Sequence, residues 1–114
     1  MSSCLFCRIV AGEIPATRVA ESANVLAFRD LQPEAPTHVL LIPREHVASS
    51  AAELTESHAA MLGELFELAA RIARDEQLER GWRLVTNVGA EGGQSVHHLH
   101  VHLLGGRPMQ WPPG

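Results

Sequence analysis

The sequence predicts an α+β domain built on a five-stranded antiparallel sheet with one long helix and one short helix. Three observations indicate this class: five short runs have strand character, a long amphipathic run follows the third of them, and neighbouring strand runs are joined by short loops. Short loops favour antiparallel pairs, because parallel strands need a crossover connection of about a dozen or more residues. We therefore expect a meander sheet with the helices packed on one side.

The N-terminal part predicts a short helix followed by two strands. Within residues 4–14 the apolar side chains recur at helical spacing, and Gly12 and Pro15 end the run. Two strand-like runs follow, residues 18–22 and residues 25–29, with a turn-forming segment between them. These runs are expected to form a pair of strands joined by a turn.

The middle of the chain predicts a central strand and then the long helix. Residues 30–36 contain two prolines, which break regular structure, so this segment is expected to be a loop. Residues 37–42 form a β-prone, continuously apolar run, which is typical of a central strand. A helix is expected from the N-cap residue Thr55 to about Arg80, because Gly81 suits the position just after a helix end.

The long helix carries two neighbouring apolar stripes. Their residues are Met61, Leu65, Leu68 and Ile72 in the first stripe and Leu62, Phe66, Ala69 and Ala73 in the second. The combined face is wider than a helix on a single sheet needs. We therefore expect a second contact on this face, with another subunit.

The last two strand runs include a cluster of histidines. Residues 82–87 have strand character, and residues 98–103 alternate polar and apolar side chains with the period of a half-buried strand. On such a strand His98, His100 and His102 face the same side, roughly 6.5 to 7 Å apart. The apolar residues between them are expected in the core: Leu99, Val101 and Leu103. Three imidazoles on one face favour nucleophilic or acid–base chemistry, with a metal site and hydrogen-bonded core histidines as the alternatives.

A glycine-rich stretch at residues 87–95 leads into the histidines. Gly92 and Gly93 can adopt positive φ and bring backbone N–H groups close to a ligand. Gln94 and Ser95 add amide and hydroxyl donors beside the imidazoles. Donors without carboxylates suit an anionic group such as a phosphate, whereas a simple turn is the alternative.

Composition limits the class of protein. The chain of 114 residues has a net charge of −4 and is expected to form a single domain, residues 1–114. It has no basic patch, so we expect no binding to nucleic acid polymers. It has no apolar run of about 18 residues and no signal-peptide core, so we expect a cytoplasmic protein that does not bind membranes. It lacks lysine and tyrosine, which excludes Schiff-base chemistry. Cys4 and Cys7 are three positions apart and indicate a metal or redox pair rather than a disulfide framework.

The tail, residues 108–114, is too rich in proline for a helix or a central strand. It places Trp111 beside prolines, which limit the entropy of the chain while the indole favours burial. A domain of this size has little core to receive it. A groove on a second subunit, near its active site, is the expected location.

The segment His98-Leu99-His100-Val101-His102-Leu103-Leu104 matches His-φ-His-φ-His-φ-φ, where φ is an apolar residue. This motif defines the histidine triad (HIT) family, which the chain resembles. The segments LFCRIVAGEIPA, LAFRDLQPEAPTHVLLIPREH, GGQSVHHLHVHLLGGR and the terminal WPPG resemble its Hint branch, the purine nucleoside phosphoramidases. The resemblance implies the HIT-like fold and a homodimer with a continuous ten-stranded sheet. It also implies hydrolysis of adenosine 5′-phosphoramidates to AMP and an amine, without a cofactor for catalysis.

The resemblance also assigns roles to residues. His100 would be the nucleophile that forms a nucleotidyl-histidine, flanked by His98 and His102. Ser95 would lie near the leaving group or the phosphate, and His38 would be a fourth histidine behind the nucleophile. Asp30 would bind the ribose hydroxyls, and Trp111 the substrate. The remaining substrate contacts would be the base pocket of Leu5, Phe6, Ile9, Phe28 and Leu31, the phosphate side of Asn87, Gly93 and Gln94, and Arg29, which replaces a histidine common in close relatives. Whether His38 or a backbone carbonyl holds the far nitrogen of the nucleophile stays open.

Zinc is the implied metal. By analogy with zinc-bearing relatives, the ligands would be Cys4, Cys7, His46 and His98, and metal-free thiols are the alternative. Three other functions compete with the phosphoramidase. They are a dinucleotide polyphosphate hydrolase, a nucleotide-binding regulatory module and a zinc-stabilised interaction protein.

Overall fold

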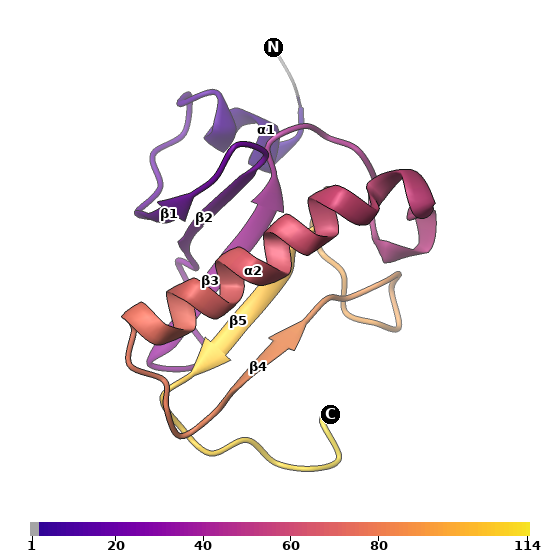
Figure 1. The fold of residues 1–114 in the computed structure, drawn as a ribbon. Coiled ribbons are helices and arrows are strands. Elements are labelled where there is room, and N and C mark those ends of the chain that lie inside the picture. The colour runs from indigo at the N-terminus through magenta and orange to yellow at the C-terminus, as the bar shows by residue number, and fades with distance from the viewer. Residues whose placement is uncertain (1–2) are drawn as a thin grey trace.

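The computed structural model describes residues 3–114, which fold around one five-stranded antiparallel sheet (Figure 1). Its strands are β1 (Arg18–Glu21), β2 (Val25–Arg29), β3 (Thr37–Pro43), β4 (Trp82–Val85) and β5 (Val101–Gly105). The helices are α1 (Leu5–Val10) and α2 (Ala59–Asp75), with short 3₁₀ turns at Ala51–Glu53 and Glu56–His58. The α+β class and all five strands confirm the expectation from sequence.

The strand order is β1-β2-β3-β5-β4, so only the first three strands follow the expected meander. β5 lies between β3 and β4 and is antiparallel to both. Three of its five residues are buried, whereas β4 has no buried residue. The more apolar strand therefore takes the inner position, and β4 forms one edge of the sheet.

The helices cover opposite faces of the sheet, which corrects the expectation that both lie on one side (Figure 1). β3 is buried along its whole length and β2 along all but its last residue, so their alternate side chains need cover on both faces. The core under α2 contains Val25, Ala27, Val39, Leu41, Leu65, Leu68, Ala69, Ile72, Val101 and Leu103. The core under α1 contains Phe6, Ile9, Leu26, Phe28, Leu40 and Ile42.

The long helix is shorter at both ends than the expected span from Thr55 to Arg80. Thr55 does act as an N-cap, but of the 3₁₀ turn that precedes α2. At the other end the chain leaves the helix after Asp75, and Gln77 takes the left-handed conformation with φ 60°. The reason is Leu78, which is buried and packs so closely on Gly105 that a Cβ there would lie 2.6 Å from it.

The apolar surface of α2 is only partly covered. In the first stripe Leu65, Leu68 and Ile72 are buried, but Phe66 in the second stripe keeps 54% of its surface exposed. Trp82 on the edge strand β4 is 40% exposed. Among residues 3–114, no helix is both long and apolar enough to span a membrane.

Candidate active site and metal cluster

The histidine segment is only partly a strand. β5 begins at Val101, so His98 and His100 lie in an irregular stretch just before it and only His102 lies within it. Two hydrogen bonds fix this stretch where a regular strand would have backbone hydrogen bonds to its neighbour. The Leu99 N–H donates to the Ala48 carbonyl at 2.9 Å, and the Thr86 hydroxyl donates to the His100 carbonyl at 2.7 Å. The expectation of three histidines on one regular strand was wrong, although His100 and His102 still line one cavity.

The ring of His100 has a defined tautomer. Its Nδ1 lies 2.8 Å from the backbone carbonyl of His98, and since a carbonyl only accepts, Nδ1 carries the proton. The Nε2 atom therefore keeps its lone pair. The ring is buried and packs edge-on against Phe6, with centroids 5.1 Å apart. Of the two holders left open by the sequence, the backbone carbonyl is the one observed.

His38 contacts His102 rather than standing behind His100. The Glu34 N–H donates to Nδ1 of His38 at 3.0 Å, so the proton of His38 sits on Nε2. That Nε2 lies 2.9 Å from Nδ1 of His102 and donates to it, which leaves the His102 proton on its own Nε2. Two groups in series, the Glu34 N–H and the His38 ring, thus set the orientation of His102, the last histidine in the motif.

His102 is neutral at physiological pH. Burial lowers its pKa to about 4, and the nearby imidazoles of His100 and His38 act in the same direction, against a smaller opposing effect of Asp30. A neutral imidazole with its proton on Nε2 offers a hydrogen-bond donor but not an ionised acid.

A cavity of about 390 Å³ opens beside these histidines on the α1 face. Ten of the residues expected at the site line it: Leu5, Phe6, Ile9, Phe28, Arg29, Asp30, Leu31, Ser95, His100 and His102. The sequence interpretation missed Ile14, Pro15, Ala16, Gln32, Leu40 and Val96. The missed residues come mainly from loops and strand faces whose position depends on the packing of α1, so no local pattern marks them.

Two charged residues of the cavity are already partly engaged. Arg29 makes two hydrogen bonds to the Glu76 carboxylate just after α2, at 2.6 and 3.1 Å, and this partner raises the pKa of the guanidinium. Asp30 accepts the Gln32 N–H at 2.8 Å through Oδ1, while Oδ2 lies 3.5 Å from Nε2 of His38. Asp30 thus both holds the turn and presents a second oxygen to the cavity.

Most of the expected phosphate contacts do not line this cavity. The side-chain oxygen of Gln94 accepts a hydrogen bond from the Gly89 N–H, and its Nε2 donates to the carbonyls of Ser49 and Val96. Asn87 and Gly93 lie outside the lining. Gly93 has φ 81°, as expected, but its N–H donates to Ala90 within the turn. The glycine-rich stretch therefore serves mainly as a turn, and only Ser95 faces the cavity.

The role of Gly92 differs from the expected one. A Cβ at this position would overlap the Val88 carbonyl oxygen, so glycine is needed for space rather than for positive φ. Trp111, the expected substrate contact in the tail, is 80% exposed and does not line the cavity of its own chain.

A second group of side chains lies behind Phe6. Cys4, Cys7, His46 and His98 bring one ligand atom each to within 4.8 Å of one another. The sulfurs of Cys4 and Cys7 lie 3.3 and 3.6 Å from Nδ1 of His98, and Cys7 Sγ lies 3.6 Å from Nδ1 of His46. Tetrahedral zinc, with Zn–S about 2.3 Å and Zn–N about 2.0 to 2.1 Å, separates sulfur from nitrogen by about 3.6 Å. These four residues could hold such a metal.

The tautomer of His98 supports this assignment. Its Nε2 lies 2.9 Å from the Pro43 carbonyl and must donate to it, so the lone pair is on Nδ1, the atom that faces the sulfurs. Burial also lowers the pKa of His98, which keeps the ring neutral as a ligand must be.

The structure brings a second set of possible metal ligands together, Asp30, His38 and His102. Here the tautomer argues against a metal. Because the Glu34 N–H points at Nδ1 of His38, the proton occupies Nε2, the very atom that would have to bind. The two clusters are equally compact, and hydrogen bonds to the distal nitrogens distinguish them.

The chain belongs to the HIT family, since the model described as "HIT domain" matches residues 11–109. This establishes the resemblance expected from the histidine motif.

Named relatives agree over nearly the whole chain. A "14 kDa zinc-binding protein" of Zea mays is 50% identical, covering 99% of this chain and 89% of that protein. "Adenylylsulfatase HINT1" of Arabidopsis thaliana is 46% identical, covering 99% of this chain and 78% of that protein. The crystal structure of a HIT family hydrolase from Legionella pneumophila superposes with a TM-score of 0.94 at 51% identity, covering 98% of this chain and 100% of that one.

Proposed function

We propose that this protein hydrolyses the P–N bond of purine nucleoside 5′-phosphoramidates, such as those of adenosine, to AMP and an amine. The observation that carries the proposal is the bond from Nδ1 of His100 to the His98 carbonyl, which leaves Nε2 as a nucleophile in a cavity. The cavity volume of about 390 Å³ lies in the range of small-molecule sites. The Arabidopsis and Legionella relatives are named as hydrolytic enzymes.

In the first step Nε2 of His100 attacks phosphorus and the P–N bond to the amine breaks. The nucleotidyl imidazolium that forms retains its Nδ1 proton, and the His98 carbonyl stabilises the positive charge. Water then attacks phosphorus, the bond to His100 breaks, and AMP leaves with the ring neutral again. Neither step needs a cofactor.

Two neighbouring residues, His102 and Ser95, contribute to stabilising the phosphoryl charge and to protonating the leaving amine. His102, neutral and protonated on Nε2, donates a hydrogen bond to a phosphoryl oxygen as charge develops there. The leaving nitrogen is protonated as the P–N bond breaks: the Ser95 hydroxyl, which also lines the cavity, donates its proton to that nitrogen while it takes one from a solvent water. The water that attacks phosphorus in the second step returns a proton to solvent.

The nucleoside occupies the apolar part of the cavity. The purine lies among Leu5, Phe6, Ile9 and Phe28, whose two phenyl rings meet edge-on with centroids 5.7 Å apart. The Asp30 oxygen that is not used by the turn accepts the ribose hydroxyls. Arg29 also lines the cavity, but both terminal nitrogens of its guanidinium donate to Glu76, so it offers no free bidentate pair of donors to the base.

The Cys/His cluster holds a structural zinc. Cys4, Cys7, His46 and His98 would supply the four ligands, and the metal would anchor α1, a helix of six residues that is too short to be stable alone. That helix carries Leu5, Phe6 and Ile9 of the cavity wall. Thiolate ligands suit a reducing compartment, which supports a cytoplasmic location.

The working unit is a homodimer with a continuous ten-stranded sheet. β4 is an edge strand, and the exposed rings of Trp82 and Phe66 lie on the two elements that would meet a second copy. The tail would then place Trp111 near the partner's cavity.

A comparison of three substrates tests the activity. We expect the highest kcat/KM for an adenosine phosphoramidate, with lower values for adenylyl sulfate and for diadenosine polyphosphates. A preference for diadenosine polyphosphates would favour the dinucleotide hydrolase, and a preference for adenylyl sulfate would favour the activity named for the Arabidopsis relative. Tight AMP binding without turnover of any of them would favour a regulatory module.

A further inference from the structure

The corner that follows β5 packs against the loop that orients His38. Gly106 has φ 92°, and a Cβ there would lie only 2.9 Å from Cβ of Pro36. The preceding residue, Gly105, is still closer to Leu78, since a Cβ there would lie 2.6 Å from the Leu78 side chain. The chain at residues 105–107 is thus wedged between the segment after α2 and the loop at residues 30–36.

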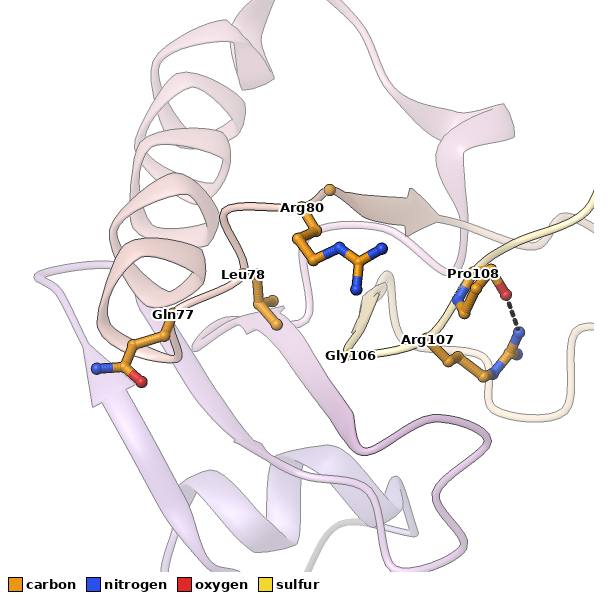
Figure 2. Close-up of a pocket in the computed structure, with 7 residues that line it drawn as sticks. Gln77, Leu78, Arg80, Gly106, Arg107 and Pro108 are labelled. Atoms are coloured by element: carbon orange, nitrogen blue, oxygen red, sulfur yellow. Dashed lines mark hydrogen bonds between the residues drawn. The ribbon is translucent and has the colours of Figure 1, made fainter.

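Arg107 extends this contact through hydrogen bonds. Its Nε–H donates to the Glu34 carbonyl at 2.9 Å, and its NH1 group donates to the Pro108 carbonyl at 3.1 Å. Arg107 borders a second cavity, of about 290 Å³, but its guanidinium turns toward Pro108 and away from Leu78, as Figure 2 shows. Its contacts are therefore with the loop and not with the interior of that cavity.

Glu34 connects Arg107 to the paired histidines. Its carbonyl accepts from Arg107, while its N–H donates to Nδ1 of His38 at 3.0 Å. Glu34 is exposed, so side-chain packing does not fix its backbone. Pro33 and Pro36 have no N–H, which leaves Glu34 as one of the few donors in this loop.

We propose that Arg107 is a positioning residue for catalysis. Its hydrogen bond to the Glu34 carbonyl keeps the Glu34 N–H directed at Nδ1 of His38. The His38 proton therefore stays on Nε2, which donates to Nδ1 of His102 across 2.9 Å. The His102 proton is thus kept on its Nε2, on the side of the substrate. The effect on turnover rests on the proposed function, whereas the effect on the His38 tautomer does not.

The test compares Arg107→Met with Arg83→Met. Both arginines donate to a backbone carbonyl near the tail, Arg83 to Gln110 at 3.0 Å, but only Arg107 reaches the loop before His38. Arg107 is exposed, so its removal opens no core. We would measure the His38 tautomer by ¹⁵N NMR of the ring nitrogens in the ligand-free protein, and kcat and KM with an adenosine phosphoramidate.

In Arg107→Met we expect a second His38 population protonated on Nδ1. We also expect kcat to fall about threefold to tenfold, the size of one lost hydrogen bond, while KM stays within about twofold. Arg107→Lys, which can still donate to the Glu34 carbonyl, should recover part of kcat, and Arg83→Met should change neither the His38 tautomer nor kcat.

A His38 ring that stays fully protonated on Nε2 in Arg107→Met would overturn the proposal. So would an equal fall of kcat in both methionine variants, or an altered tautomer with wild-type kcat. If the wild type does not turn over phosphoramidates at all, the proposed function fails, and the NMR comparison still decides whether Arg107 positions His38.

Discussion

The backbone carbonyl of His98 accepts a hydrogen bond from Nδ1 of His100, while the His98 side chain lies against the sulfurs of Cys4 and Cys7. One residue therefore belongs to the candidate metal cluster and also fixes the tautomer of His100, the proposed nucleophile. Phe6, between the two cysteines in sequence, packs edge-on against both rings. The candidate metal cluster and the proposed nucleotide site therefore share Phe6 as a common wall.

The first prediction concerns the metal. Protein purified without added metal should contain close to one zinc per chain by elemental analysis, because four ligand atoms lie within 4.8 Å of one another. His46→Asn should lose most of it, whereas His97→Asn, at an exposed histidine outside the cluster, should keep it. Chelation should lower Tm. Less than about a tenth of a zinc per chain in the wild type would contradict the assignment.

The second prediction follows from the low pKa of His102. In the unfolded chain this imidazole takes up a proton near pH 6.5, but in the folded protein only near 4, so between these values unfolding binds a proton. The free energy of unfolding should therefore fall as the pH drops from about 6.5 to 4. The groups that face the ring are His38, His100 and Asp30.

His102→Asn should weaken this pH dependence, and His97→Asn should leave it unchanged, since His97 is exposed. Urea denaturation of the three proteins at several pH values measures the slopes. An unchanged slope in His102→Asn would show that the ring titrates alike in both states.

The third prediction concerns ribose recognition by Asp30. Asp30→Ala should reduce kcat/KM for adenosine phosphoramidates much more than for their 2′,3′-dideoxy analogues, because the ribose hydroxyls would lose a half-buried acceptor. Equal losses for both substrates would mean that Asp30 acts only through the turn, where it accepts the Gln32 N–H.

The fourth prediction concerns the dimer and the tail. Light scattering should show a dimer at micromolar concentration, and Phe66→Asp, which places a charge on an exposed part of α2, should give a monomer. Deletion of residues 109–114 should keep the dimer but change KM or the preference for the leaving group. A wild-type monomer, or an unchanged substrate profile after the deletion, would contradict this proposal.

The sequence predicted elements that depend on local pattern and missed those that depend on packing. The continuous apolar run of β3 predicted a central strand. The Cys4–Cys7 spacing indicated a metal or redox pair, and the resemblance to zinc-bearing relatives added His46 and His98, a cluster that the fold does assemble. The alternation in the histidine segment could not reveal that hydrogen bonds to Ala48 and from Thr86 replace a strand ladder.

Other errors have the same origin. The end of α2 depends on the burial of Leu78 against Gly105, a contact between positions 27 residues apart. Gln94 carries suitable donors for a phosphate, but its amide is used by Gly89, Ser49 and Val96. Motif spacing predicts which residues carry the chemistry, whereas the hydrogen-bond partner of each ring nitrogen is visible only in three dimensions.

The most direct test of the account is mass spectrometry of protein quenched during turnover of an adenosine phosphoramidate. We predict an AMP adduct on His100, absent in His100→Ala, whose kcat should fall by several orders of magnitude because no lysine or tyrosine can replace the nucleophile. An adduct on another residue, or near-wild-type turnover by His100→Ala, would contradict the central claim.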